Sequence, residues 1–176
     1  MVVAGTALLW AGFDYLHHEY FGFFRISEHI YLLYMPAGYR LVAIFTFGWL
    51  GALGVVIAYM IRLYFFRGFS PETSLVLGAL YGLAPFMAFK IWEKVFDIHA
   101  DLMNISLHNI FWLSVLSATI NALFRVAFFA SIDLPHGIDQ ICQLITGNLL
   151  GTFFVLYALK MAVELLKTLK AQLIGK

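Results

Sequence analysis

Three polar side chains near the N-terminus have the types and the spacing of a metal site. Asp14, His17 and His18 stand at positions i, i+3 and i+4, so a helix would place them on one face. One carboxylate and two imidazoles on a shared face can hold a transition metal. The alternative is a group of polar residues at the interfacial end of a helix. The six histidines of the chain form no second motif with this spacing, and both interpretations stay open.

A second polar group lies within an apolar stretch further along the chain. Asn121 and Arg125 are four residues apart, on one face of a predicted helix. An arginine at the centre of a membrane-spanning helix costs about 2.5–3.5 kcal/mol on insertion, so it usually faces the bundle interior. We therefore predict that Arg125 faces a ligand, a partner or a polar cavity, with Asn148 of the next helix as its neighbour. Snorkelling of Arg125 to the headgroup layer is the alternative.

His108 is the third candidate for a ligand-binding residue. Asp101, Asn104 and His108 share a helix face that leads from the interface into an apolar stretch, where a proton or ligand path could begin. A solvated loop is the alternative. A buried haem would need axial histidines on facing helices, and only His108 lies within a predicted span. The cofactor therefore stays unknown.

Motifs of known catalytic machinery do not accompany these residues. The sequence holds no nucleophile–base arrangement, no P-loop and no zinc-binding motif. The single cysteine, Cys142, excludes an internal disulfide. We predict that the protein is not an enzyme, and a metal- or haem-dependent membrane enzyme is the alternative.

The composition indicates what must position these side chains. Of the 176 residues, 62% are hydrophobic and 12% are charged. Soluble domains carry about 45–50% apolar and about 25% charged residues, so this chain could not cover a water-facing surface. A formal net charge of +1 gives no reason to expect a nucleic-acid partner. The sequence therefore predicts an integral membrane protein whose first partner is the lipid bilayer.

Apolar stretches predict an all-α, polytopic transmembrane helix bundle in a single domain, residues 1–176. The run Leu41–Ile61 has no charged residue, and its length of about 30 Å matches the bilayer core. The segment before Pro36 is amphipathic and too short to span, which predicts an interfacial or re-entrant segment. We expect about five spans and an amphipathic tail at residues 162–176, the spans being about 2–24, 41–61, 73–89, 104–130 and 138–161.

Small residues predict where these helices meet. Pairs four residues apart form rails that allow close helix–helix approach, namely Gly48/Ala52, Gly78/Gly82 and Gly147/Gly151. Ser70 and Pro71 are residue types that are typical of a helix N-cap and of the first helical position, so they predict the start of a helix. Pro85 is expected to kink the third span.

Lysine and arginine positions predict an orientation in the bacterial inner membrane. The tail after Lys160 is rich in lysine while the 131–140 loop has none, so we expect the C-terminus to be cytoplasmic. Five spans would then put the N-terminus outside and Arg40 inside. Arg62 and Arg67 fall on the wrong side of this scheme.

Two glycine-containing steps resemble the bacterial membrane-associated sensor domains of the MASE type. The first is Tyr34-Met35-Pro36-Ala37-Gly38, which leads into a long apolar helix. The second is Thr146-Gly147-Asn148-Leu149-Leu150-Gly151-Thr152, which is similar to the family's Gly-Asp-Leu-Leu-Gly step with Asn148 in place of Asp. The resemblance covers about residues 8–165 and implies a sensory role. It transfers no catalytic residues.

Two hypotheses of function follow from these observations. The first is a non-enzymatic sensory or accessory module that acts through a membrane or cytoplasmic partner protein and holds a small ligand. The second is a substrate-binding subunit of a vitamin-type uptake transporter. A cavity lined by Arg125, Asn121 and Asn148, together with an energising partner, would favour transport.

Overall fold

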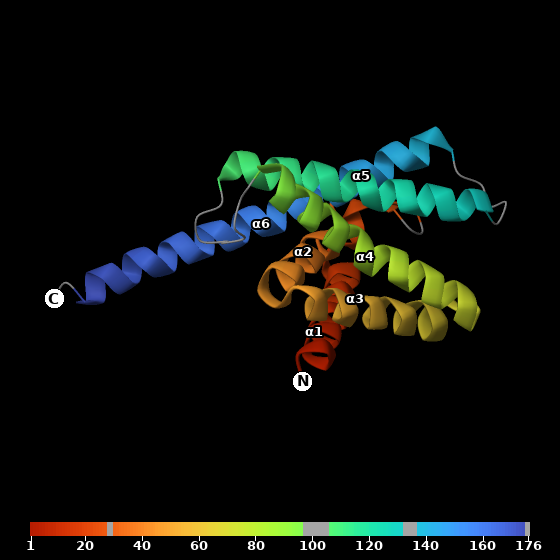
Figure 1. The fold of residues 1–176 in the computed structure, drawn as a ribbon, viewed down its shortest axis with the longest axis horizontal. Helices are drawn as coiled ribbons and strands as arrows, with labels where there is room; N and C mark the ends of the chain where they lie inside the picture. The colour runs from red at the N-terminus through yellow and green to blue at the C-terminus, as the bar shows by residue number, and fades with distance from the viewer. Residues whose placement is uncertain (28–29, 97–105, 132–136, 175–176) are drawn as a thin grey trace.

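The computed structural model describes residues 1–27, 30–96, 106–131 and 137–174 (Figure 1). Between the first two helices lie a 3-10 turn, η1 (Gly22–Phe24), and an antiparallel hairpin of β1 (Arg25–Ser27) and β2 (Ile30–Tyr31). The predicted all-α bundle is confirmed, and the predicted interfacial segment before Pro36 contains this hairpin. The helices are α1 (Val2–Tyr20), α2 (Pro36–Phe47), α3 (Trp49–Ile61), α4 (Pro71–Phe96), α5 (Leu107–Ser131) and α6 (Ile138–Ile174).

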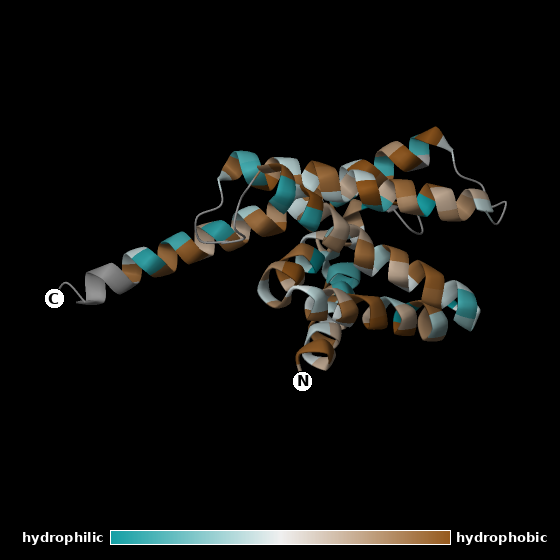
Figure 2. Ribbon diagram, viewed as in Figure 1, coloured by the Kyte–Doolittle hydropathy of each residue, from teal (hydrophilic) through white to brown (hydrophobic). Residues whose placement is uncertain are grey.

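Four helical stretches are long and apolar enough to cross a membrane. Figure 2 shows hydrophobic residues distributed around these helices, as expected for segments that meet lipid. The polar C-terminal end of α1, from Asp14 to Glu19, distinguishes α1 from them. The described residues therefore indicate a membrane-embedded protein, with α1 as a shorter, more polar companion of the stretches 49–66, 71–96, 107–131 and 141–169.

The predicted single span over Leu41–Ile61 is wrong, because the chain breaks at Gly48. This glycine ends α2 and begins α3 with φ +56°, a conformation that side chains with a Cβ rarely adopt. Gly51 then lies directly against the backbone carbonyl of Ala43. Residues eight apart in a straight helix are separated by about 12 Å, so this contact shows that the chain reverses direction. The span instead runs from Trp49 through the π-helix η2 (Arg62–Phe66).

The boundaries of the helices after α3 differ less from the predicted ones. α4 begins with the predicted cap, since the Thr73 amide donates to Ser70 Oγ at 3.2 Å, and it stays helical through Pro85. α6 is one helix of 37 residues that includes both the fifth span and the described part of the tail. In Figure 1 its C-terminal half extends well beyond the other helices.

Reversal at Gly48 also corrects the predicted orientation of the N-terminal half. Arg40 of α2 and Arg62 after α3 line one cavity, so they lie at the same end of the bundle and not on opposite sides of the membrane. Helix α1 runs toward this end, because Thr6 lies beside Gly54 and Asp14 pairs with Arg62. The N-terminus is therefore directed away from Arg62, as is the C-terminal half of α6. We call the end that carries Arg62 and the start of α6 the arginine end.

Helix packing follows the chain order, with α3 on α1 and α4, α4 on α5, and α5 on α6. The last helix, α6, closes the arrangement by packing against α2. Buried aromatic side chains fill two cores. Trp10 and Tyr59 join α1 to α3, and Phe89 and Trp92 of α4 pack against α2 and α5.

Two of the three predicted glycine rails lie at close contacts. A Cβ on Gly82 would meet Val56, so the α3–α4 contact is confirmed. Gly147 and Gly151 lie against the backbone carbonyls of Tyr31 and Tyr34, which belong to the segment before α2 and not to a helix. The prediction is wrong for Gly48, which has open space around it because it serves as the break.

Gly151 offers a test of this packing. Replacing it by Ala puts a methyl group against the Tyr34 carbonyl, which is backbone and cannot rotate away. We expect Gly151→Ala to lower the free energy of unfolding in detergent by about 1–3 kcal/mol. Gly12→Ala is the matched control, because Gly12 is also helical and has nothing within 4 Å. Equal melting temperatures for the two variants would contradict the described contact of α6 with Tyr34.

Candidate functional site

All six α-helices contribute to one cavity of about 130 Å³, which we call the arginine cavity. Among the residues that the structure describes, its lining includes no aspartate and no glutamate, and it includes four tyrosines, at positions 31, 34, 59 and 81. A cavity with several cations and no carboxylate is electrostatically suited to an anion. The cationic lining residues are Arg40, Arg62, Arg67 and Arg125.

Local structure explains why these arginines meet. Arg40 lies in the second turn of α2, and the reversal at Gly48 returns the chain so that Arg62 follows α3 at the same end. Arg62 opens the π-helix η2, and such wide turns are frequent at functional sites. Arg125 arrives from the last two turns of α5, which runs toward the arginine end.

An ion pair anchors one wall of the cavity. Arg62 Nη1 lies 2.8 Å from Asp14 Oδ1, and Arg62 Nη2 lies 2.8 Å from His18 Nε2. The Tyr34 hydroxyl donates to the same Asp14 oxygen at 3.1 Å and lies 3.1 Å from the Tyr59 hydroxyl. Asp14 is 6% exposed, so this network holds a charge pair largely shielded from solvent. It ties α1, α3 and the segment before α2 together.

Arg40 is the most deeply buried cation of the lining, at 2% exposed. Its Nη2 donates to Asn148 Oδ1 at 3.2 Å and its Nη1 donates to the Tyr81 carbonyl at 3.3 Å. The guanidinium also lies 5.7 Å from the centre of the Tyr59 ring. Its Nε has no hydrogen-bond partner among the described residues. Neutral acceptors and an aromatic ring therefore surround a full positive charge.

Arg125 and the two asparagines predicted beside it, Asn121 and Asn148, all line the arginine cavity. Arg125 is half-buried and its guanidinium lies 5.0 Å from the Phe129 ring centre. Among the described residues, the expected hydrogen bonds from Arg125 to the two asparagines are not formed. Asn148 Oδ1 accepts from Arg40 instead, and the Asn121 amide nitrogen, itself a donor, has no partner there. Their joint position is as predicted. Their role in binding stays a prediction.

The remaining ligand-binding candidate, His108, is not brought to the cavity. His108 is exposed at the start of α5, with its ring 6.1 Å from that of Trp112. Asp101 and Asn104, predicted to share its face, lie outside the described residues.

The metal hypothesis for Asp14, His17 and His18 is not supported by the geometry. Arg62 contacts both Asp14 and His18, so a guanidinium stands where the metal would be held. His17 stacks on Phe21, with ring centres 5.7 Å apart. In the described ranges, no group of three metal-binding side chains comes together.

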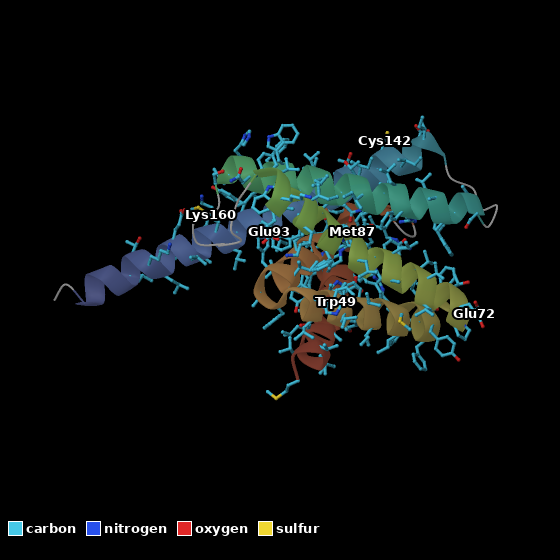
Figure 3. All side chains as sticks on the ribbon, in the orientation of Figure 1. Trp49, Glu72, Met87, Glu93, Cys142 and Lys160 are labelled. Atoms are coloured by element: carbon cyan, nitrogen blue, oxygen red, sulfur yellow. The ribbon has the colours of Figure 1, made fainter. Side chains whose placement is uncertain are left out.

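Sequence reasoning missed Arg40 and Arg62 as site residues. A signal was present in the separation of the two cation types. All six lysines follow residue 89, whereas four of the five arginines precede it. In the described residues the lysines lie at the other end of the bundle, at the end of α4 and in the far half of α6. We call this the lysine end, and Figure 3 shows Lys160 far from Glu72 and Cys142, which mark the arginine end.

Comparison with known proteins adds no relative to this picture. No protein-family model, no curated protein and no solved structure matches the chain. The resemblance to MASE-type sensor domains therefore stays a prediction.

The Asp14–Arg62 pair predicts a large cost for removing one partner. Asp14→Asn leaves Arg62 shielded from water without its carboxylate, and breaking such buried pairs costs about 3–5 kcal/mol. We expect Asp14→Asn to destabilise the protein strongly, and Asp14→Asn combined with Arg62→Gln to cost less than the sum of the single changes. Thermal and denaturant unfolding of the four proteins measures this coupling.

Lys90 and Glu93 provide the matched control. Their ion pair is as short, at 2.7 Å, but the lysine side chain is 54% exposed. Exposed pairs contribute at most about 1 kcal/mol, so Glu93→Gln should change stability little. Similar losses for Asp14→Asn and Glu93→Gln would refute the anchoring role of the buried pair.

Proposed function

We propose that this protein is a non-enzymatic sensory or accessory module of the membrane that binds a small ligand in the arginine cavity. The observation that carries the proposal is the convergence of four arginines, from three segments of the chain, on one cavity whose described lining residues include no acidic side chain. Guanidinium and amide groups supply charge and hydrogen bonds but are not nucleophiles or bases at neutral pH, and the imidazole of the lining, His18, is engaged by Arg62 at 2.8 Å. Binding rather than chemistry is therefore the role that this lining supports.

The size of the cavity limits the ligand. A volume of about 130 Å³ is close to the cavity of about 150 Å³ that accommodates benzene in an engineered protein core. The ligand, or the part of it that enters, therefore has the size of a single ring or a short chain. Tyr59 and Tyr81 offer it aromatic surface beside the charged groups.

We propose a bacterial inner-membrane location with the lysine end in the cytoplasm. Lysines concentrate there in the loop-proximal part of α4 and in the tail of α6, and cytoplasmic flanks carry excess positive charge. The arginines that line the arginine cavity lie within the binding site and not in loops, so we do not count them in the loop charge that sets the orientation. The arginine cavity would then receive its ligand from the periplasmic side.

Helix α6 supports communication with a partner protein. Its first turns line the cavity through Leu144 and Asn148, and its 37 residues extend for about 55 Å. The far half exposes Leu165, Leu166 and Leu169 beyond the bundle. A shift of Asn148 on ligand binding would therefore be carried along one continuous helix to the cytoplasmic side.

A substrate-binding subunit of an uptake transporter is the second candidate function. The arrangement of Arg125, Asn121 and Asn148 on one cavity supports it, because a guanidinium and two amides can hydrogen-bond a polar substrate. Uptake additionally requires an energising partner. Transport would be favoured over sensing if proteoliposomes that contain the chain and that partner accumulate substrate while proteoliposomes with the chain alone do not.

A cavity-filling substitution tests ligand binding. Leu144→Trp should fill the arginine cavity without removing a polar group, whereas Leu150→Trp on the same helix adds the same bulk to a position that is 42% exposed. We expect native mass spectrometry of protein in nanodiscs made from its own membranes to detect a bound small molecule in the wild type and in Leu150→Trp, and to lose it in Leu144→Trp. Retention of the molecule by Leu144→Trp would contradict the proposal.

The single cysteine tests the orientation. Cys142 is exposed near the start of α6, at the arginine end. A membrane-impermeant maleimide should label it on intact cells. In the matched control, Cys142→Ser with Thr168→Cys, the exposed position 168 of the tail should react only after permeabilisation. The reverse pattern would place the arginine cavity on the cytoplasmic side.

A further inference from the structure

We propose that the ligand of the arginine cavity is a compact dianion, a dicarboxylate or a phosphate monoester group, held between Arg40 and Arg125. This inference rests on the proposed function, because it names the chemical class of the ligand of the same site. It follows from a balance of charges, from the donors left without partners, and from the shape of the guanidinium group.

The charge balance of the lining leaves two cations without a carboxylate. Arg62 is matched by Asp14 at 2.8 Å, and Arg67 is exposed to solvent. Among the described residues, Arg40 and Arg125 have no acidic partner, and their contacts are with neutral groups and aromatic rings. Two inward cations without counter-charge require two negative charges for neutrality.

Burial makes this imbalance costly. Arg40 is 2% exposed, and a charge taken out of water must be compensated by a counter-charge and by hydrogen bonds. Asn148, the Tyr81 carbonyl and the Tyr59 ring supply only partial negative charge. An anion beside Arg40 would supply the compensation that the described residues lack.

Hydrogen bonding gives an independent argument for an acceptor. A guanidinium has five N–H donors, and the described residues accept only two hydrogen bonds from Arg40. Arg40 Nε and the Asn121 amide nitrogen are both buried and without partners among the described residues. Since both atoms can only donate, the group that satisfies them must accept.

Geometry favours carboxylate and phosphate among anions. The planar guanidinium fork donates two parallel hydrogen bonds to either group, which spherical anions cannot accept in this way. Arg40 and Arg125 line the same cavity as Tyr81, whose carbonyl accepts a hydrogen bond from Arg40, so the two arginines border one space. A compact dianion can reach both.

The same chemistry can come from two sources. A soluble dianion would enter the cavity from the aqueous side, whereas the headgroup phosphate of an anionic lipid would enter from the bilayer. The experiment therefore uses protein in phosphatidylcholine nanodiscs with soluble probes, and a parallel sample in nanodiscs that also contain phosphatidic acid.

Four soluble probes distinguish the contribution of the ligand's charge to binding from the contribution of its shape. Succinate and inorganic phosphate carry the proposed charge, acetate carries one negative charge, and succinamide is the neutral isostere of succinate. We expect succinate or phosphate, or phosphatidic acid in the lipid arm, to raise the melting temperature and to give a calorimetric binding signal. Acetate should bind at least about tenfold more weakly, because it leaves one arginine without a counter-charge.

Arg40→Gln and Arg125→Gln should each weaken binding of the effective dianion by about 10- to 100-fold, the value of one or two charge-assisted hydrogen bonds. Lys94→Gln at the lysine end removes the same charge from an exposed position and should leave affinity unchanged. Arg125 is half-buried and makes no side-chain hydrogen bond to a described residue, so Arg125→Gln keeps the test valid if Arg40→Gln does not fold.

Three outcomes would overturn the inference: equal binding of succinamide and succinate, binding that both arginine variants leave intact, or the absence of binding by every dianion in both lipid arms. None of them would remove the proposed function, which fails only if Leu144→Trp retains the molecule that the wild type carries. The two failures are therefore distinguishable.

Discussion

The cost of holding a guanidinium inside a bilayer is the constraint on which the structure depends. Lipid tails offer neither acceptors nor counter-charge, so each inward arginine must obtain both from the protein or from a bound ligand. Arg62 finds a carboxylate, Asp14, and Arg40 finds the Asn148 amide, a carbonyl and two tyrosine rings. These partners lie on five different segments, since no single helix can surround a guanidinium. Satisfying the arginines therefore draws the bundle together around the cavity.

Gly48 is the residue that makes this convergence possible. Had Leu41–Ile61 been one straight helix, Arg40 and Arg62 would stand about 33 Å apart, at opposite faces of the membrane. The positive φ of Gly48 and the close contact of Gly51 with Ala43 fold the stretch back on itself, which brings both arginines to the arginine end. A local backbone preference thus decides the charge distribution of the whole protein.

The sequence predicts the helices well and the site only in part. Long apolar runs predict membrane-spanning helices, so hydropathy alone is enough to predict α4, α5 and α6. Arg125, Asn121 and Asn148 could be predicted as neighbours, because polar residues within long apolar helices must turn inward. Arg40 and Arg62 could not, since they border apolar stretches and fit equally well as interfacial charges. Their pairing with Asn148 and Asp14 depends on a reversal that one glycine among the 14 of the chain produces, and composition does not mark which one.

Asn148 links the cavity to the rest of α6 because of its two neighbours on the helix. Gly147 and Gly151 have no side chains, so the carbonyls of Tyr31 and Tyr34 approach α6 directly, and the Tyr34 amide donates to the Gly147 carbonyl at 3.0 Å. Tyr34 in turn bonds Asp14, and Asp14 holds Arg62. A ligand that draws Arg40 away from Asn148 would break that hydrogen bond of α6, while the hydrogen bond to the Tyr34 amide and the packing against α5 remain. Helix α6 could then pivot about the Gly147–Gly151 contact, and its far end, which extends beyond the bundle, would move the most.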